Sequence, residues 1–314
     1  MTGLSIQTHT LGVTYGSRYS TKIALTDATL DLSPNTICGV VGHAGTGKST
    51  LLSVLAGFQR PTHGQVKIHG EDPFDSSRLA PRIHLVRGPE DLVREKRTLD
   101  SVRLMAQLRP SFDSHYALAL MDSFGIDARK KMMRLTLKQR FTASLLLGLA
   151  SRAPVTLFDE VYRGLDTSTG DLFYTELQRD YAAHPRTVVL AGALDNRAEQ
   201  LCTSITLLHK NRILLSEDIG TLRERASTFV GSRTAVNEIT ERIPQEAIMA
   251  RQHKGDSYSV TVLGSISVET SIRAKRIGLT RTAVPLSRII TRLTDQPTPT
   301  NQRTHQAKTR GEKP

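Results

Sequence analysis

Residues 42–50 read GHAGTGKST, and this stretch restricts the fold of the chain more than any other. It follows the apolar run 37–41 (ICGVV), which is typical of a buried strand, and it leads into 50–58 (TLLSVLAGF), which favours a packed helix. Its glycines let the backbone turn tightly, so that several N–H groups point inward at an anion. A strand, a glycine-rich loop and a helix in this order predict an α/β protein with a phosphate-binding loop.

The spacing within the loop assigns roles to its residues. Four residues separate Gly42 from Gly47, and Lys48 and Ser49 follow directly, as in nucleotide-phosphate loops. We expect the Lys48 ammonium to reach the β- and γ-phosphates and the Ser49 hydroxyl to help hold Mg²⁺. The positive end of the following helix would face the same phosphates. The predicted nucleotide-binding residues of the loop are Gly42, His43, Ala44, Gly45, Thr46, Gly47, Lys48, Ser49 and Thr50.

A second polar pair ends the segment VTLFDE at 155–160. Its mainly apolar first four residues predict a buried strand, which places Asp159 and Glu160 at the carboxyl end, where open α/β sheets bind ligands. We expect Asp159 to bind Mg²⁺, directly or through water, because carboxylate oxygens are ligands that this ion prefers. We expect Glu160 to polarise the attacking water as a general base.

The remaining pattern separates the chain into parts. Residues 4–41 alternate apolar and polar positions and predict an antiparallel β region. Strands then alternate with helices up to about residue 217, which predicts a mainly parallel sheet with crossover helices. Helices near 234–243 and 269–278 flank the strand-like 257–264, which favours a small α+β domain.

Charge and composition limit the class of protein. The net charge is +12, and residues 226–314 alone hold 14 Lys and Arg against 7 Asp and Glu. This excess favours a nucleotide, anionic lipid or nucleic acid as neighbour, or a merely solvated basic surface. No run of 18 apolar residues and no signal-peptide pattern is present, so we expect a cytoplasmic protein. Cys38 and Cys202 lie in or beside apolar stretches and are interpreted as reduced core thiols.

Over residues 1–220 the order of the motifs resembles the ATP-binding subunit of ABC transporters. Within the family, the segments at 152–166 and 181–190 look closest to bacterial ATPases paired with multidrug- or antibiotic-type exporters. The motifs that carry the resemblance are TYG (14–16), GHAGTGKST (42–50), PTHGQVKIHG (61–70), LTLKQR (135–140), VTLFDE (155–160) and GLD (164–166).

The resemblance implies a fold and a domain order. The expected fold is α/β, with a RecA-like P-loop NTPase core, an antiparallel β subdomain, a helical subdomain inserted at about 89–152 and a small C-terminal α+β domain. The domains would be an ATP-binding domain at 1–225, an accessory or regulatory domain at 226–295 and a disordered basic tail at 296–314. The cofactors implied are ATP and Mg²⁺. Tyr15 would stack on adenine, although simple packing is the alternative for an aromatic residue there.

Three positions depart from the family pattern. Where the family has Leu-Ser-x-Gly-Gln, this chain has the signature segment 135–139 (LTLKQ), with Lys138 in place of glycine. In the family this segment completes the nucleotide site of the opposite subunit, and Lys138 would crowd it. Ala193 stands where the family has a switch histidine, while His184 and His209 are out of register. The loop after 83–87 lacks the usual glutamine; Glu90 either replaces it or is simply a solvated charge.

These departures predict firm Mg·ATP binding with slow or partner-dependent hydrolysis. They favour a heterodimer in which a second ATP-binding subunit supplies an intact signature. The resemblance implies a separate membrane-spanning permease and a place on the inner face of the cell membrane, with no nucleic acid as partner. Two alternatives stay open: a soluble ABC-type ATPase acting on nucleic acid or the ribosome, and an ATP-binding regulator that does not hydrolyse.

Overall fold

The computed structural model describes residues 3–17, 20–160, 164–192, 196–264 and 266–295. The chain divides into two compact units, unit 1 (Met1–Ser227) and unit 2 (Thr228–Pro314). No helix among the described residues combines the length and the apolar content that crossing a bilayer requires.

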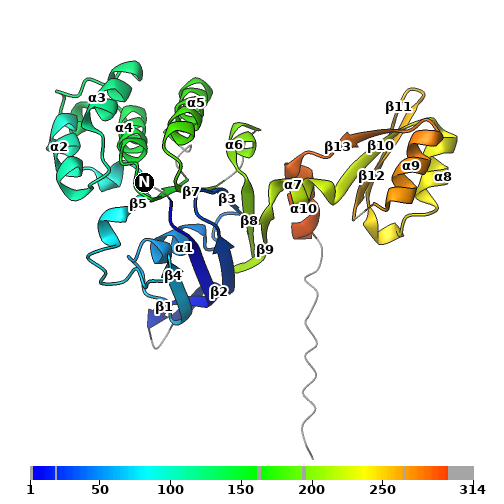
Figure 1. Cartoon of the computed structure of the whole chain (residues 1–314), viewed down its shortest axis with the longest axis horizontal. Helices are drawn as coiled ribbons and strands as arrows, with labels where there is room; N and C mark the ends of the chain where they lie inside the picture. Colours follow the sequence, from blue (N-terminus) through cyan, green and yellow to red (C-terminus); the bar gives the residue numbers. More distant parts are fainter. Residues whose placement is uncertain (1–2, 18–19, 161–163, 193–195, 265, 296–314) are drawn as a thin grey trace, which may run out of the picture. The chain divides into compact units, whose positions relative to one another are not determined.

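A six-stranded sheet in the order β5-β6-β7-β3-β8-β9 forms the centre of unit 1 (Figure 1). The first five strands are parallel, and β9 runs antiparallel to β8. Strands β3, β5, β6 and β7 are buried along their whole length, as expected for strands inside a parallel sheet. The bounds are β3 Ile37–Val41, β5 Ile83–Val86, β6 Val155–Asp159, β7 Thr187–Ala191, β8 Ser204–His209 and β9 Arg212–Asp218.

The register of this sheet brings the two predicted site segments to one level. Val40 on β3 and Asp159 on β6 both pair with Ala191 on β7, which lies between them. Because all three strands are parallel, their carboxyl ends reach the same edge of the sheet. The loop after β3 and the carboxylates after β6 therefore emerge side by side.

An antiparallel sheet in the order β2-β1-β4 makes up a second part of unit 1. Its residues alternate between buried and exposed, so one face joins the core, as the 4–41 pattern predicted. Tyr15 on β1 pairs with Lys22 on β2, close to the end of this hairpin. The bounds are β1 Ile6–Ser17, β2 Ser20–Leu32 and β4 His63–Ile68.

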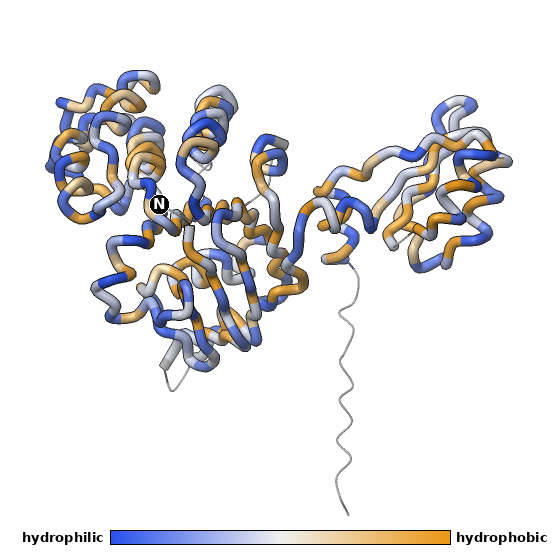
Figure 2. The backbone as a smooth tube through the Cα atoms, in the orientation of Figure 1, coloured by the Kyte–Doolittle hydropathy of each residue, from blue (hydrophilic) through white to orange (hydrophobic). Residues whose placement is uncertain are grey.

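Three helices, α2 to α4, form the inserted subdomain, and they lie together in Figure 1. Blue and orange residues alternate along α2 and α3 in Figure 2, as in helices with one buried face, whereas α4 is buried on all sides from Thr142 to Ala150. Gly148 lets α4 approach the sheet, because a methyl group there would lie 3.0 Å from Phe158 Cε1 on β6. The bounds are α2 Thr98–Leu108, α3 Ser114–Ser123 and α4 Leu137–Ala150, with short 3₁₀ turns at Ala80–Arg82, Pro89–Asp91 and Met132–Arg134.

A cluster of ion pairs ties the inserted helices to the rest of unit 1. Arg152, just after α4, donates to Asp113 Oδ2 (2.8 Å) at the start of α3 and to Asp180 Oδ1 (2.9 Å) on α5. Asp180 also pairs with Arg186, and both side chains are almost fully buried. Removing one member of such a cluster would leave an uncompensated buried charge, which costs about 3–5 kcal/mol. The other helices of unit 1 are α1 Lys48–Leu55, α5 Thr167–Ala183, α6 Asn196–Leu201 and α7 Ile219–Glu224.

Unit 2 has its own sheet and its own core. Its elements follow the order βαββαβ, with one further helix, and the strands lie in the order β11-β12-β10-β13. The bounds are β10 Ala226–Gly231, α8 Arg233–Thr240, a 3₁₀ turn Gln245–Ala247, β11 Ile248–Lys254, β12 Ser257–Leu263, α9 Val268–Arg276, β13 Thr280–Ala283 and α10 Leu286–Asp295. The core is centred on Phe229, Ile239, Val260 and Val262.

The expected fold class is confirmed in all its parts: the α/β core, the antiparallel β subdomain, the inserted helices and the C-terminal α+β domain. The expected tail at 296–314 lies outside the described residues.

Candidate nucleotide site

The loop between β3 and α1 needs its glycines for steric reasons. Gly47 has φ 100°, and a methyl group on it would run into the carbonyl oxygen of Ala24. A methyl group on Gly42 would lie 2.5 Å from the carbonyl oxygen of Leu208. Helix α1 starts immediately after Gly47, and the first N–H groups of a helix have no acceptor within the helix. The loop therefore presents free donors and the positive end of α1 on one side.

Lys48 lies at the centre of the loop and is only 5% exposed. Its Nζ donates to the carbonyl oxygens of Gly42 (2.9 Å) and His43 (3.1 Å). The same atom lies 3.6 Å from Glu160 Oε1. A buried ammonium is thus held between the loop and the carboxylates of β6.

Ser49 and Asp159 meet across the same edge of the sheet. Ser49 Oγ donates to Asp159 Oδ1 at 3.0 Å. Burial raises the pKa of Asp159, although the hydrogen bond from Ser49 opposes this shift. A hydroxyl and a carboxylate are oxygen ligands of the kind that Mg²⁺ takes, and this ion fills its remaining positions with water and phosphate oxygens. The pair therefore fits a magnesium ion that bridges to a nucleotide.

Glu160 follows with a left-handed backbone, at φ 51°. Its N–H donates to the carbonyl oxygen of Ala191 at 2.9 Å, so the end of β7 holds this turn in place. A left-handed conformation costs free energy in residues other than glycine, and such strain is concentrated at functional sites.

Lys48, Ser49 and Glu160 border a hollow of about 150 Å³. Tyr15 reaches it from β1, and its hydroxyl donates to Thr50 Oγ1 at 3.3 Å. The Tyr15 side chain is 40% exposed and is therefore accessible to a ligand. The lining residues are Tyr15, Lys22, Ala24, Gly45, Gly47, Lys48, Ser49, Thr50 and Glu160. The structure thus brings together residues that the sequence analysis took from three separate segments.

Two residues near this hollow were missed by the sequence analysis. Lys22 lines it from β2, where it lies opposite Tyr15. Asn211, in the turn between β8 and β9, donates to the carbonyl oxygens of Gly45 (3.2 Å) and Ala24 (3.0 Å). Asn211 has φ 62°, so its sequence signal is that of a turn residue, and nothing local connects it to the loop.

The signature segment makes contacts within its own chain. Thr136 caps α4, because its Oγ1 accepts from the N–H of Gln139 (3.2 Å), while Gln139 Oε1 accepts from the N–H of Thr136 (3.0 Å). The Lys138 ammonium pairs with the Asp166 carboxylate. This hydrogen bond, together with those from Thr169, holds the pKa of Asp166 well below its usual range. Lys138 therefore has a partner in the loop that follows β6.

The other departures lie in different places. Glu90 is exposed on the 3₁₀ turn after β5, and among the described residues it forms no hydrogen bond or ion pair with Ser49 or Asp159. Asp91 beside it accepts from the backbone N–H of Arg87 (2.8 Å) and from its Nη2 (3.0 Å). Burial raises the pKa of Asp159, and the positive charge of Arg87 is one of the influences that oppose this rise. Ala193 lies outside the described residues.

The two histidines that are out of register each lie beside a residue that is close to them in sequence. His184 Nδ1 lies 3.3 Å from Asp180 Oδ1 at the end of α5. His209 ends β8 and pairs with Arg212 of β9.

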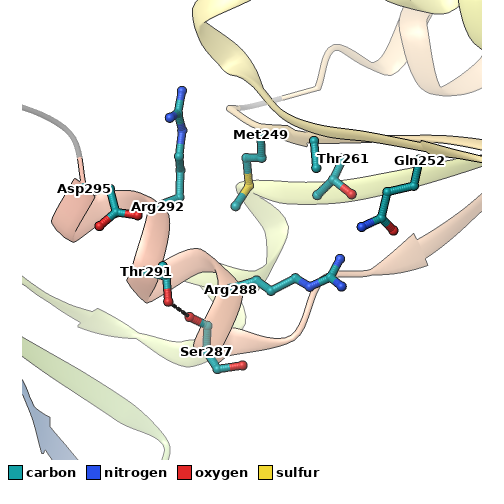
Figure 3. Close-up of a pocket in the computed structure, with 9 residues that line it drawn as sticks. Met249, Gln252, Thr261, Ser287, Arg288, Thr291, Arg292 and Asp295 are labelled. Atoms are coloured by element: carbon teal, nitrogen blue, oxygen red, sulfur yellow. Dashed lines mark hydrogen bonds between the residues drawn. The ribbon is translucent and has the colours of Figure 1, made fainter.

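Unit 2 has a separate hollow of about 500 Å³ between α10 and the strands β11 and β12 (Figure 3). Arg288, Arg292 and Asp295 of α10 line it, together with Met249 and Gln252 of β11. No glycine is among its described lining residues, whereas Gly45 and Gly47 line the hollow of unit 1.

Comparison with known proteins gives consistent matches. The sequence model of the ABC transporter family matches residues 25–163. The aliphatic sulfonates import ATP-binding protein SsuB 1 of Rhodococcus jostii is 30% identical over 211 residues, covering 67% of this chain and 79% of that protein. The methionine import ATP-binding protein MetN of Streptococcus pyogenes is 23% identical over 265 residues, covering 78% and 75%.

Solved structures match in fold. The dimeric post-hydrolysis state of the ATP-binding cassette MJ0796, bound to ADP and Pi, has a TM-score of 0.62 and 21% identity. The match covers 98% of that chain and 68% of this one. A nucleotide-free ATP-binding cassette from an ABC transporter has a TM-score of 0.56 and 15% identity, with 91% of it covered.

Proposed function

The chain belongs to the ABC transporter family as an ATP-binding cassette ATPase, and we propose that it binds Mg·ATP at 42–50 and uses its hydrolysis to drive a separate permease. One observation carries the site assignment: four side chains from two segments 110 residues apart meet at one edge of the sheet. Ser49 Oγ lies 3.0 Å from Asp159 Oδ1, and Lys48 Nζ lies 3.6 Å from Glu160 Oε1.

Each group has one task in this proposal. The donors of the loop and Lys48 bind the phosphates, and Tyr15 stacks on the adenine. Ser49 and Asp159 hold Mg²⁺, which supplies charge neutralisation for the transferred phosphoryl group. Glu160 accepts the proton of the attacking water. In the described structure Lys48 lies against Glu160, so a γ-phosphate would compete for the ammonium and release the carboxylate for this task.

Hydrolysis is proposed to be slow or dependent on a partner subunit. The signature of this chain has Lys138 where a glycine would let the backbone approach a phosphate. The Lys138 ammonium pairs with Asp166, so its positive charge has a partner within this chain. A heterodimer is therefore the favoured assembly: this chain would supply Lys48, Asp159 and Glu160 to a site that a second subunit completes with a better signature.

The permease would recruit the chain to the inner face of the membrane as a peripheral subunit, with the net charge of +12 favouring anionic headgroups. Export, which the sequence resemblance favours, stays a prediction. The two named relatives are import proteins, and the groups at 42–50 and 159–160 serve either direction.

Calorimetric titration of the purified chain with Mg·ATP tests the proposal. Lys48→Ala should weaken binding by about 10- to 100-fold, because a hydrogen bond from a charged group contributes about 1.5–3 kcal/mol. Lys67→Ala is the matched control, since Lys67 is an exposed lysine on β4. Equal affinities for the wild type and Lys48→Ala would contradict the site assignment.

A non-hydrolysing regulator is the second candidate, and the Lys138–Asp166 pair is the observation that favours it. Phosphate release from the chain alone and with its co-purified partner separates the two candidates. A rate that rises with the partner and is lost in Glu160→Gln supports the motor. Co-purification with ribosomes or nucleic acid instead of a permease would favour a soluble ATPase.

A further inference from the structure

Helix α4 touches two loops, one after β5 and one after β6, and Phe141 contacts both. Its ring lies so close to Gly164 that a methyl group there would overlap it. A methyl group on Gly88 would lie 3.0 Å from Phe141 Cε1. The half-buried ring is therefore seated between two positions that lack a side chain.

Both loops follow strands of the central sheet, one carrying Asp159 and the other lying next to it. Residues 88–91 follow β5 and end in Asp91, which accepts hydrogen bonds from Arg87. Residues 164–166 come shortly after β6 and end in Asp166, which caps α5. Since β5 and β6 are neighbouring parallel strands, the two loops emerge at the same edge of the sheet.

Neighbouring residues of α4 strengthen both contacts. Lys138, one turn before Phe141, pairs with Asp166. Ser144, one turn after it, donates from Oγ to the carbonyl oxygen of Gly88 at 2.9 Å in a buried position. Residues spaced by three lie on one face of a helix, so a single face of α4 holds both loops.

We infer that Phe141 is a positioning residue, which makes α4 and the two loops move as one body. The helix begins at the signature segment, which faces the second subunit in the proposed function, and the inference rests on that function. A displacement of α4 by the partner would pass through the packed ring to both loops, because close-packed groups transmit shifts of this kind. Phe141 itself does not line the hollow of the candidate nucleotide site.

A double-mutant cycle at positions 141 and 164 tests the inference on the full chain. Gly164→Ala should lower the rate of phosphate release at saturating Mg·ATP by about tenfold or more, while the Kd for ATP changes by less than about twofold. In a Phe141→Ala background the same change should cost much less, because the ring is gone and only the contact with Cβ of residue 141, at 2.8 Å, stays. Gly170→Ala on α5 is the matched control, since its added methyl group meets no atom within 4 Å.

Two kinetic results would overturn the inference. One is a Gly164→Ala loss of the same size in both backgrounds; the other is an equal loss in Gly170→Ala. If the wild-type chain neither binds nor hydrolyses ATP, the proposed function fails.

Hydrogen exchange tests the linkage independently of activity. Phe141→Ala should speed amide exchange in both 88–91 and 164–170, and Phe141→Leu should restore protection in both. Faster exchange in only one of the two loops, or in neither, would overturn the inference whatever the ATPase rates.

Discussion

Asp159 and Glu160 are adjacent in sequence, yet the chain gives them different surroundings. Asp159 is 9% exposed at the end of a strand, bonded to Ser49. The Glu160 side chain is 24% exposed and lies against the Lys48 ammonium. Different surroundings allow two carboxylates to take different roles, here metal ligand and base.

Glu160→Gln is expected to separate binding from hydrolysis. The amide cannot accept a proton, so phosphate release should fall by about 100-fold or more, while the Kd for Mg·ATP stays within a few-fold. Phosphate release and calorimetry measure the two quantities, with Glu241→Gln on the exposed surface of unit 2 as control. A Glu160→Gln rate close to that of the wild type would rule out the base assignment.

Asp159→Asn is expected to remove a magnesium ligand while keeping or raising the stability of the nucleotide-free chain. Because burial raises the pKa of Asp159, the ionised carboxylate destabilises the folded chain. This destabilisation is fully present above the raised pKa and is relieved as the pH falls through it toward the ordinary value of 3.8. Asn keeps an acceptor for Ser49, so the Tm of the nucleotide-free chain at pH 7 should stay equal or rise, by about 2–4 °C per kcal/mol gained.

The added stability from Mg·ATP should disappear in the same variant, because a metal ligand is lost. Thermal unfolding with and without Mg·ATP measures both effects. A variant that is less stable without nucleotide, yet still stabilised by Mg·ATP, would contradict the metal-ligand assignment.

At the scale of elements, α4 links the signature segment to the sheet. Its N-terminus depends on the reciprocal bonds of Thr136 and Gln139. Its C-terminal half packs on β5 and β6 through Gly148. One helix thus joins the signature segment to the strand that carries the carboxylates.

Thr136→Ala removes the cap of α4 and should cost about 1 kcal/mol. For a unit of this size that corresponds to a fall in Tm of about 2–4 °C. Thr136→Ser keeps the hydroxyl, and its Tm should lie within about 1 °C of the wild type, since Ser and Thr cap comparably. Thermal unfolding by circular dichroism gives both values. An equal fall in the two variants would show that the methyl group, and not the cap, stabilises the helix.

Local signals predicted the elements that carry the site. The apolar runs at 37–41 and 155–160 became β3 and β6. The contacts of Asn211 and Phe141 could not be predicted, because they join segments that only the folded topology brings together. In unit 2 the strands β10, β11 and β13 and helix α10 were missed, since their patterns are short or half-exposed.

At the scale of the whole molecule, each of the two units has a hydrophobic core of its own among the described residues. The core of unit 1 extends from the antiparallel sheet across β3 to β6, and the candidate nucleotide site belongs to it alone. The core of unit 2 is made by its own strands and helices. A ligand of unit 1 should therefore stabilise one part of the chain and leave the other unchanged.

Calorimetric unfolding of the full chain should show two transitions, of which only the larger shifts with Mg·ATP. At a nucleotide concentration 100 times the Kd, the stabilisation is about 2.7 kcal/mol, or roughly 5–10 °C. Lys48→Ala at the same concentration is the control without tight binding. A single transition that shifts as a whole would contradict the independence of the two units.

The left-handed backbone at Glu160 also limits which residues can replace it during evolution. Valine, isoleucine and threonine fit such a backbone poorly, whereas glycine, asparagine and aspartate adopt it readily. A descendant in which this position has lost its proposed role as a base would keep the local backbone most easily with one of those three residues. Copies of this gene whose products no longer hydrolyse ATP should therefore carry glycine, asparagine or aspartate at position 160.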